Sequence, residues 1–156
     1  MKIQLQNVLP DEIEKRSFEI ISQELGQIEL DPLIEPVLKR VIHTTADFEY
    51  VENLKFSQDA VKKGMEALRN GAVIITDTQM ARSGINKKTL EELGGEALCY
   101  MADDDVAADA KANGTTRATA SMDKAAKLEK PVIFAIGNAP TALVRLYELI
   151  KEEKLK

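Results

Sequence analysis

The 156-residue chain is 44% hydrophobic and 30% charged, which is typical of a soluble globular protein, and one domain over residues 1–156 is expected. Its net charge of −5 argues against a nucleic-acid partner, and one cysteine and one histidine are too few for a disulfide or the usual zinc ligands. Residues 1–10 lack the continuous apolar block of a secretory signal, and no apolar run is long enough to cross a bilayer, so a cytoplasmic protein without a membrane partner is expected.

The first third of the sequence is predicted to be helical. Apolar residues recur at helical spacing over residues 11–25, and Gly26 follows as a stop signal. The same spacing predicts a second helix over residues 32–42 and a third over residues 57–70.

The only histidine, His43, follows the second predicted helix. Histidine is the side chain whose unperturbed pKa suits proton transfer near neutral pH, so His43 is the obvious acid–base candidate. Its position is opposite the apolar residues of that helix, which are Ile34, Val37, Leu38, Val41 and Ile42. Two interpretations follow: a solvated histidine at the negative end of the helix dipole, or a catalytic group.

The remaining sequence alternates between strands and helices. Strands are predicted over residues 72–76, 97–101 and 132–136. Helices are predicted over residues 87–93, 104–112 and 116–128, and from Pro140 to the end. The alternation predicts an α/β fold, a three-layer sandwich with a mostly parallel sheet, preceded by the N-terminal helical segment. In such folds ligands gather where the strands end.

Polar loops follow the first and third predicted strands. Residues 77–86 carry a carboxylate and a guanidinium, Asp77 and Arg82, for which a simple ion pair within the loop is the alternative to ligand binding. After the third strand, Pro140 suits the first position of a helix whose free N–H groups would bind an anion, whereas Asn138 as a plain cap is an equal alternative. The glycine spacing is not that of a dinucleotide site or a P-loop, so nucleotide binding is only weakly supported.

Arg117 lies at the predicted start of a helix, where a positive charge is unfavourable for the helix dipole. A different partner is therefore expected for it, such as an anionic ligand. Arg16, Arg82 and Arg117 would clamp several carboxylates if the fold brought them together.

These residues together resemble the precorrin-8X methylmutase family, including its cobalt-precorrin-8 members. The matching stretches run in the family's order through nearly the whole chain. They are Arg16-Ser17-Phe18, Arg40-Val41-Ile42-His43, Asp77-Thr78-Gln79-Met80 with Gly84, Thr116-Arg117, and Ile136-Gly137-Asn138-Ala139-Pro140-Thr141-Ala142-Leu143.

The resemblance implies an isomerase of corrin (cobalamin) biosynthesis that moves a methyl group from C11 to C12, giving hydrogenobyrinate or cobyrinate. It implies that His43 is the proton donor, that no cofactor is needed, and that the protein is a homodimer with its site near the subunit interface. Whether the corrinoid substrate carries cobalt stays open. The substrate-binding residues expected on this basis are Arg16, Thr78, Met80, Arg82, Gly84, Arg117 and Asn138.

Family members also usually continue beyond the position matching Lys151, with a GxPVGFV strand and loop and an RGxxGGS segment, whereas this sequence stops at Lys156. The alternative is therefore a noncatalytic corrinoid-binding relative or a truncated fragment of the enzyme.

Overall fold

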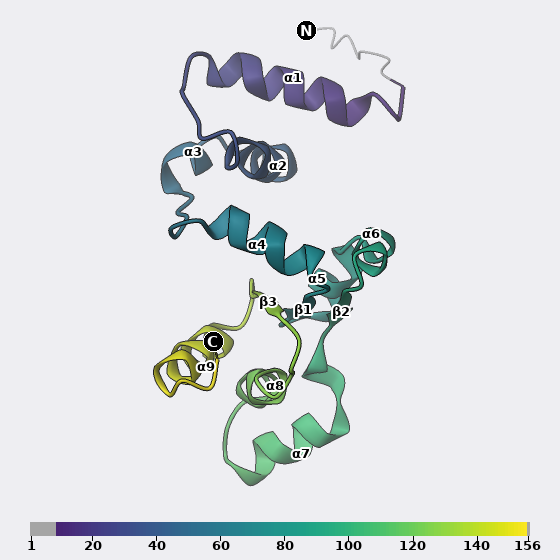
Figure 1. Ribbon diagram of the computed structural model, residues 1–156, viewed down its shortest axis with the longest axis vertical. Helices are drawn as coiled ribbons and strands as arrows, with labels where there is room; N and C mark the ends of the chain where they lie inside the picture. The colour runs from purple at the N-terminus through teal and green to yellow at the C-terminus, as the bar shows by residue number, and fades with distance from the viewer. Residues whose placement is uncertain (1–8, 156) are drawn as a thin grey trace, which may run out of the picture. The chain divides into compact units, whose positions relative to one another are not determined.

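The computed structural model describes residues 9–155 and shows two compact units, divided between Lys62 and Lys63 (Figure 1). We call residues 9–62 the helical unit and residues 63–155 the sheet unit; α4 (Ala60–Arg69) spans the division. The expectation of one domain stays a prediction. The stretch expected to lack a secretory signal, residues 1–10, lies largely outside the described residues, and no helix within residues 9–155 has the length and apolar content needed to span a membrane.

The helical unit contains the first two predicted helices and a third, short one. They are α1 (Ile13–Leu25), α2 (Glu35–Thr45) and α3 (Tyr50–Asn53). The first two confirm the prediction, although α2 starts and ends three residues later than expected; α3 was not predicted. Burial of four side chains between α1 and α2 stabilises the unit, and these are Ile21, Leu25, Leu38 and Ile42.

The turn after α2 has an unusual backbone. Ala46 ends the helix in the left-handed region, with φ at 55°, and its N–H donates to the Ile42 carbonyl over 2.7 Å. A non-glycine residue rarely adopts this conformation, which favours glycine. The turn redirects the chain toward Phe48, which lines the same pocket as Ala46.

The sheet unit contains three parallel strands in the order β2-β1-β3, as the strand and helix alternation predicted. The strands are β1 (Val73–Thr76), β2 (Glu96–Leu98) and β3 (Val132–Ala135). The prediction for β2 was too long, because the chain turns after Cys99 into a 3-10 helix, η1 (Tyr100–Ala102).

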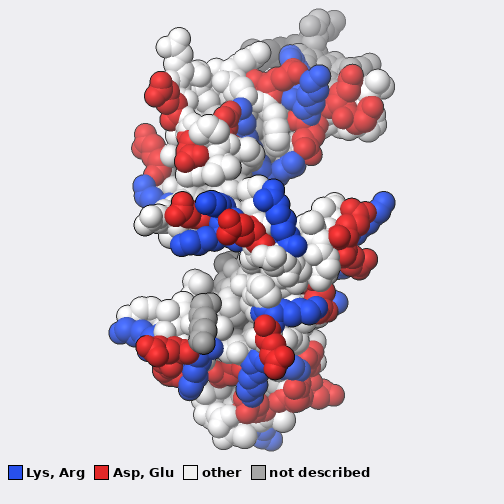
Figure 2. Space-filling view, viewed as in Figure 1, with Lys and Arg blue, Asp and Glu red and all other residues white. Residues whose placement is uncertain are grey.

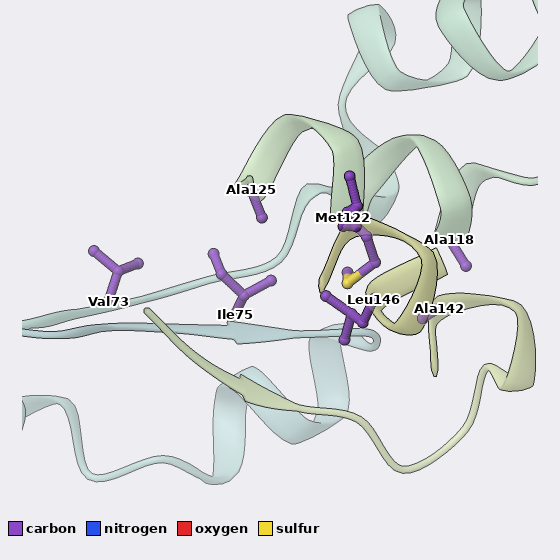
Figure 3. Close-up of a cluster of buried hydrophobic side chains, with 8 residues drawn as sticks. Val73, Ile75, Ala118, Met122, Ala125, Ala142 and Leu146 are labelled. Atoms are coloured by element: carbon purple, nitrogen blue, oxygen red, sulfur yellow. The ribbon is translucent and has the colours of Figure 1, made fainter. Parts of the chain in front are cut away.

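Helices cover both faces of this sheet. Figure 1 shows α8 (Arg117–Ala125) and α9 (Pro140–Lys151) on one side and α6 (Lys87–Glu92) on the other. The core lies on the side of α8 and α9, where Val73 and Ile75 of β1 belong to one buried cluster with side chains of both helices (Figure 3). The remaining helices of the unit are α5 (Gln79–Gly84) and α7 (Asp104–Ala112). The predicted α/β class with a parallel sheet is confirmed; α5 falls where a loop was predicted.

One close approach fixes β2 against β1. Gly95 precedes β2, and a Cβ atom there would lie 2.5 Å from the Ala72 carbonyl oxygen and 2.8 Å from the Leu90 side chain. Only glycine fits this position without a shift of the backbone.

Acidic and basic side chains are interspersed on the surface. On the face shown in Figure 2, Lys and Arg side chains alternate with Asp and Glu over both units. This distribution fits the small net charge of −5.

Candidate functional site

His43 lies on α2 beside α1, within the helical unit. Its Nδ1 is 2.7 Å from the Ser17 hydroxyl oxygen, and its ring meets the Phe18 ring edge-on with centroids 5.6 Å apart. The ring is half-buried beside α1, and His43 lies in the last turn of α2. The periodicity of α2 identified the side facing the core but could not show that α1 also covers the side bearing His43.

A pocket of about 500 Å³ opens beside this histidine, which is within the usual range of small-molecule sites. Its wall is largely apolar, with polar groups from Arg16, Ser17 and His43. The other lining residues are Ile13, Ile20, Ile21, Ile42, Ala46 and Phe48. The pocket thus offers apolar contact area, one titratable ring and one guanidinium.

An ion pair joins the two helices next to the pocket. Arg40 donates two hydrogen bonds to the Glu14 carboxylate, over 2.9 and 2.8 Å, and its guanidinium lies 5.0 Å from the centre of the Phe18 ring. The hydrogen bond from Arg40 lowers the pKa of Glu14, and the charge of Arg40 adds to this effect. The pair therefore favours one alignment of α1 on α2 and one position of Phe18.

Arg16 lies at the edge of the pocket on α1. It is exposed and pairs with Glu19 over 3.2 Å along the same helix. Such an exposed pair is weak, so the guanidinium is available to a ligand.

In the sheet unit, Asp77 follows β1 and is only 2% exposed. Its carboxylate accepts hydrogen bonds from the backbone N–H groups of Ala139, Asn138 and Gly137, over 2.6, 2.7 and 3.4 Å. Burial raises the pKa of Asp77, but these backbone donors together outweigh it and hold the pKa below its usual value.

This contact corrects two expectations. The N–H groups of residues 137–139, directly before α9, do not point freely into a crevice, because they donate to the Asp77 carboxylate. Asp77 therefore binds backbone rather than forming a loop ion pair with Arg82. The alternative of Asn138 as a plain cap is also wrong, since Ala139 is the N-cap residue of α9.

The residues predicted after β1 belong to α5. Thr78 caps this helix by accepting a hydrogen bond from the Ala81 N–H over 3.1 Å, and Gly84 is its last residue. Met80 is 85% exposed. Arg82 instead turns toward β2, where its Nε donates to the Ala97 carbonyl over 2.9 Å.

Arg117 is the first residue of α8 and is exposed. The only hydrogen bond of its side chain among the described residues is a long one of 3.5 Å to the Met101 carbonyl. Beside it, the Thr116 hydroxyl lies 3.1 Å from that of Thr141 and links the starts of α8 and α9. Arg117 and Asn138 therefore lie at neighbouring helix starts, where the strands end.

The structure thus brings His43 and Arg16 together in the helical unit, while the other predicted residues belong to the sheet unit. Sequence reasoning gave no role to Ser17 or Phe48, although both line the pocket. The spacing of α1 could have indicated Ser17, because Ile13, Ser17 and Ile20 recur at helical intervals on one side of the helix.

The sequence and the fold are both similar to known proteins. A model of the precorrin-8X methylmutase family matches residues 12–156. The cobalt-precorrin-8 methylmutase of Priestia megaterium is 46% identical over 149 residues, covering 96% of this chain and 66% of that protein. The Salmonella typhimurium protein of the same name is 48% identical, covering 89% and 69%.

A solved structure agrees with these relatives. The precorrin-8x methyl mutase from Thermus thermophilus superimposes with a TM-score of 0.81 at 43% identity, covering 91% of this chain and 69% of that one. The chain therefore spans about two thirds of the length of the proteins it matches.

Proposed function

The chain belongs to the precorrin-8X methylmutase family, and from this premise we propose that it is an isomerase of corrin biosynthesis with His43 as its proton donor. The reaction proposed is the shift of a methyl group from C11 to C12 of precorrin-8X or cobalt-precorrin-8, giving hydrogenobyrinate or cobyrinate. We also propose that the active form is a homodimer.

The proposed chemistry makes few demands on the protein. A methyl shift within one molecule leaves the atoms and electrons of the substrate in balance and calls for no external oxidant or reductant. The protein has to hold the macrocycle in a reactive conformation and to supply a proton as the methyl group migrates. One titratable ring beside an apolar pocket meets both needs.

The observation that carries the proposal is the position of the only histidine. His43 lies in the wall of the largely apolar pocket, beside Ser17 and Arg16, and Nε2 is the ring nitrogen left without a partner among residues 9–155. An apolar wall suits the ring system of a tetrapyrrole, and an exposed guanidinium suits one of its carboxylate arms.

For the sheet unit we propose further contacts with the carboxylate arms of the substrate. Arg117 is the best supported, because it is exposed and its side chain has only one long hydrogen bond within the described residues. Arg82 has its Nε engaged with Ala97 and one terminal nitrogen in a long contact of 3.5 Å with Gln79, so its other terminal nitrogen is the one proposed to meet a ligand. The remaining proposed contacts are Thr78, Met80, Gly84 and Asn138.

The test is a spectroscopic assay with both forms of the substrate, precorrin-8X and cobalt-precorrin-8. The intact chain is mixed with each, and conversion is followed in the visible spectrum. His43→Ala and His43→Gln should lower the rate by about 100-fold or more, because general acid catalysis is worth about that much. Lys39→Ala is the matched control, since Lys39 lies on α2 and does not line the pocket.

The alternative function, binding of a corrinoid without turnover, is kept because the chain spans about two thirds of the length of its relatives. Equal binding by the intact chain and His43→Ala, with no conversion by either, would support it. Conversion that survives both histidine substitutions would overturn the role of His43.

A further inference from the structure

We propose that Ser17 is a positioning residue for His43: its hydroxyl holds the imidazole by Nδ1 and so makes Nε2 the nitrogen that exchanges the proton. The inference deepens the proposed function and rests on it only for the destination of the proton. The contact itself is a property of the helical unit.

The geometry ties the ring at one point. Ser17 on α1 and His43 on α2 are 26 residues apart in sequence, and their Oγ and Nδ1 atoms are 2.7 Å apart. The Phe18 ring meets the imidazole edge-on and is itself covered by Arg40. The imidazole is thus held on two sides, and no other residue within 9–155 forms a hydrogen bond with it.

Ser17 uses its hydroxyl differently from its neighbours. A helical serine or threonine commonly donates its hydroxyl proton to the carbonyl four residues earlier. Three residues of the helical unit do so: Ser22 to Phe18, Thr44 to Arg40 and Thr45 to Val41. Within the described residues, the hydroxyl of Ser17 has His43 on the other helix as its hydrogen-bond partner.

A hydroxyl can both donate and accept, so it can hold Nδ1 in either protonation state. In the neutral ring, Ser17 donates to Nδ1, which leaves the ring proton on Nε2, and uptake of one proton from solvent at Nδ1 gives the imidazolium. In the imidazolium, Nδ1–H donates to Ser17 Oγ, and Nε2 carries the proton to be given away. After Nε2 transfers that proton, the neutral ring keeps Nδ1–H on Ser17 until a proton from solvent restores Nε2–H. No rotation of the ring is needed at any step.

The test uses the fact that the chain contains one histidine. Labelling with ¹⁵N-histidine gives two ring-nitrogen signals, both from His43, in the substrate-free protein. The intact chain should show a neutral ring with the proton on Nε2 and, in the imidazolium, an Nδ1–H signal protected from exchange with solvent. Ser17→Ala should give mixed tautomers and lose that protection, and Ser17→Thr should restore both.

Ser22→Ala is the matched control, because Ser22 lies on the same helix and its hydroxyl bonds within that helix. It should leave the ring signals unchanged. In the assay with corrinoid substrate, Ser17→Ala should lower kcat on the order of 10- to 100-fold with little change in KM, as expected for a misplaced proton donor.

The proposal is overturned if Ser17→Ala keeps the ring signals of the intact chain, or if Ser22→Ala changes them to the same degree. The spectra and the assay also separate the two proposals. Ring signals that respond to Ser17→Ala in a protein whose turnover survives His43→Ala would retain the positioning contact and remove the proton-donor role.

Discussion

The two units differ in whether the polar groups of the predicted site already have partners within the protein. In the helical unit, His43 and Arg16 face a pocket, and one ring nitrogen has no partner among the described residues. In the sheet unit, the backbone N–H groups of Asn138 and Ala139 that seemed suited to an anionic ligand are already occupied by the Asp77 carboxylate. Ligands generally gather at the ends of parallel strands, but a carboxylate of the protein itself can occupy that place instead.

Removal of the internal anion has the largest expected effect. Asp77→Ala should lower the free energy of unfolding by about 3 kcal/mol, because it removes a buried, charged acceptor that is bonded to the N–H groups of Asn138 and Ala139. Added acetate should restore part of this loss in Asp77→Ala and have no such effect on the intact chain. Urea denaturation followed by circular dichroism measures both.

The control for this prediction is Asp104→Ala, an exposed carboxylate in the first turn of α7, which should cost less than about 1 kcal/mol. Equal stabilisation of the intact chain and Asp77→Ala by acetate would show that the N–H groups are not a closed anion site.

Acid should weaken the same contact by a smaller amount. The folded pKa of Asp77 is lowered, so its carboxylate stabilises the protein above the unfolded pKa and stops doing so as the pH falls through the folded pKa. The difference in unfolding free energy between the intact chain and Asp77→Asn should therefore be constant near neutral pH and shrink below about pH 4. A difference that stays constant down to about pH 3 would contradict the lowered pKa.

Substitution of two arginines of the sheet unit should change the free energy of unfolding by amounts that differ by about 1 kcal/mol. Arg82→Ala removes the donor to the Ala97 carbonyl and should lower stability by about 1 kcal/mol, whereas Arg117→Ala should change it by less than about 0.5 kcal/mol. Cys99, only 6% exposed and two residues beyond Ala97, provides a local probe. Its alkylation should become about fivefold faster in Arg82→Ala and stay unchanged in Arg117→Ala. Equal rates of Cys99 alkylation in Arg82→Ala and Arg117→Ala would contradict the expected difference between the two arginines.

The smallest expected effect is a gain of stability in the helical unit. Ala46 has a left-handed backbone, so Ala46→Gly should relieve strain and raise the free energy of unfolding by about 0.5 kcal/mol. The same replacement inside α4, Ala67→Gly, should lower it by about 1 kcal/mol. Thermal or urea unfolding distinguishes the two signs, and a loss in both variants would mean that the turn is not strained.

Much of the fold could be predicted from local patterns. Apolar periodicity predicted α1 and α2, and short β-branched runs between helices predicted the parallel sheet. The helix α5 was missed because its six residues, Gln79–Gly84, carry no apolar stripe and depend on the Thr78 cap. The strand predicted through Met101 ended early because the chain turns into η1.

The site depended on contacts that no local pattern contains. The Asp77 carboxylate meets backbone groups about 60 residues away, and Ser17 meets His43 across 26 residues. A sequence read by periodicity can place such groups on a helix or after a strand. It cannot show which of them pair with one another and which face a pocket.

The strand order has a consequence for the growing polypeptide. β1 is the central strand, and its partner β3 is synthesised only after α5, α6, β2, α7 and α8. While the ribosome makes these segments, one edge of β1 lacks its neighbouring strand. The apolar side chains of Val73 and Ile75 are not yet covered by α9 during this time. By contrast, the helices that hold Ser17 against His43 emerge together within the first 62 residues, so this contact can form long before the sheet is complete.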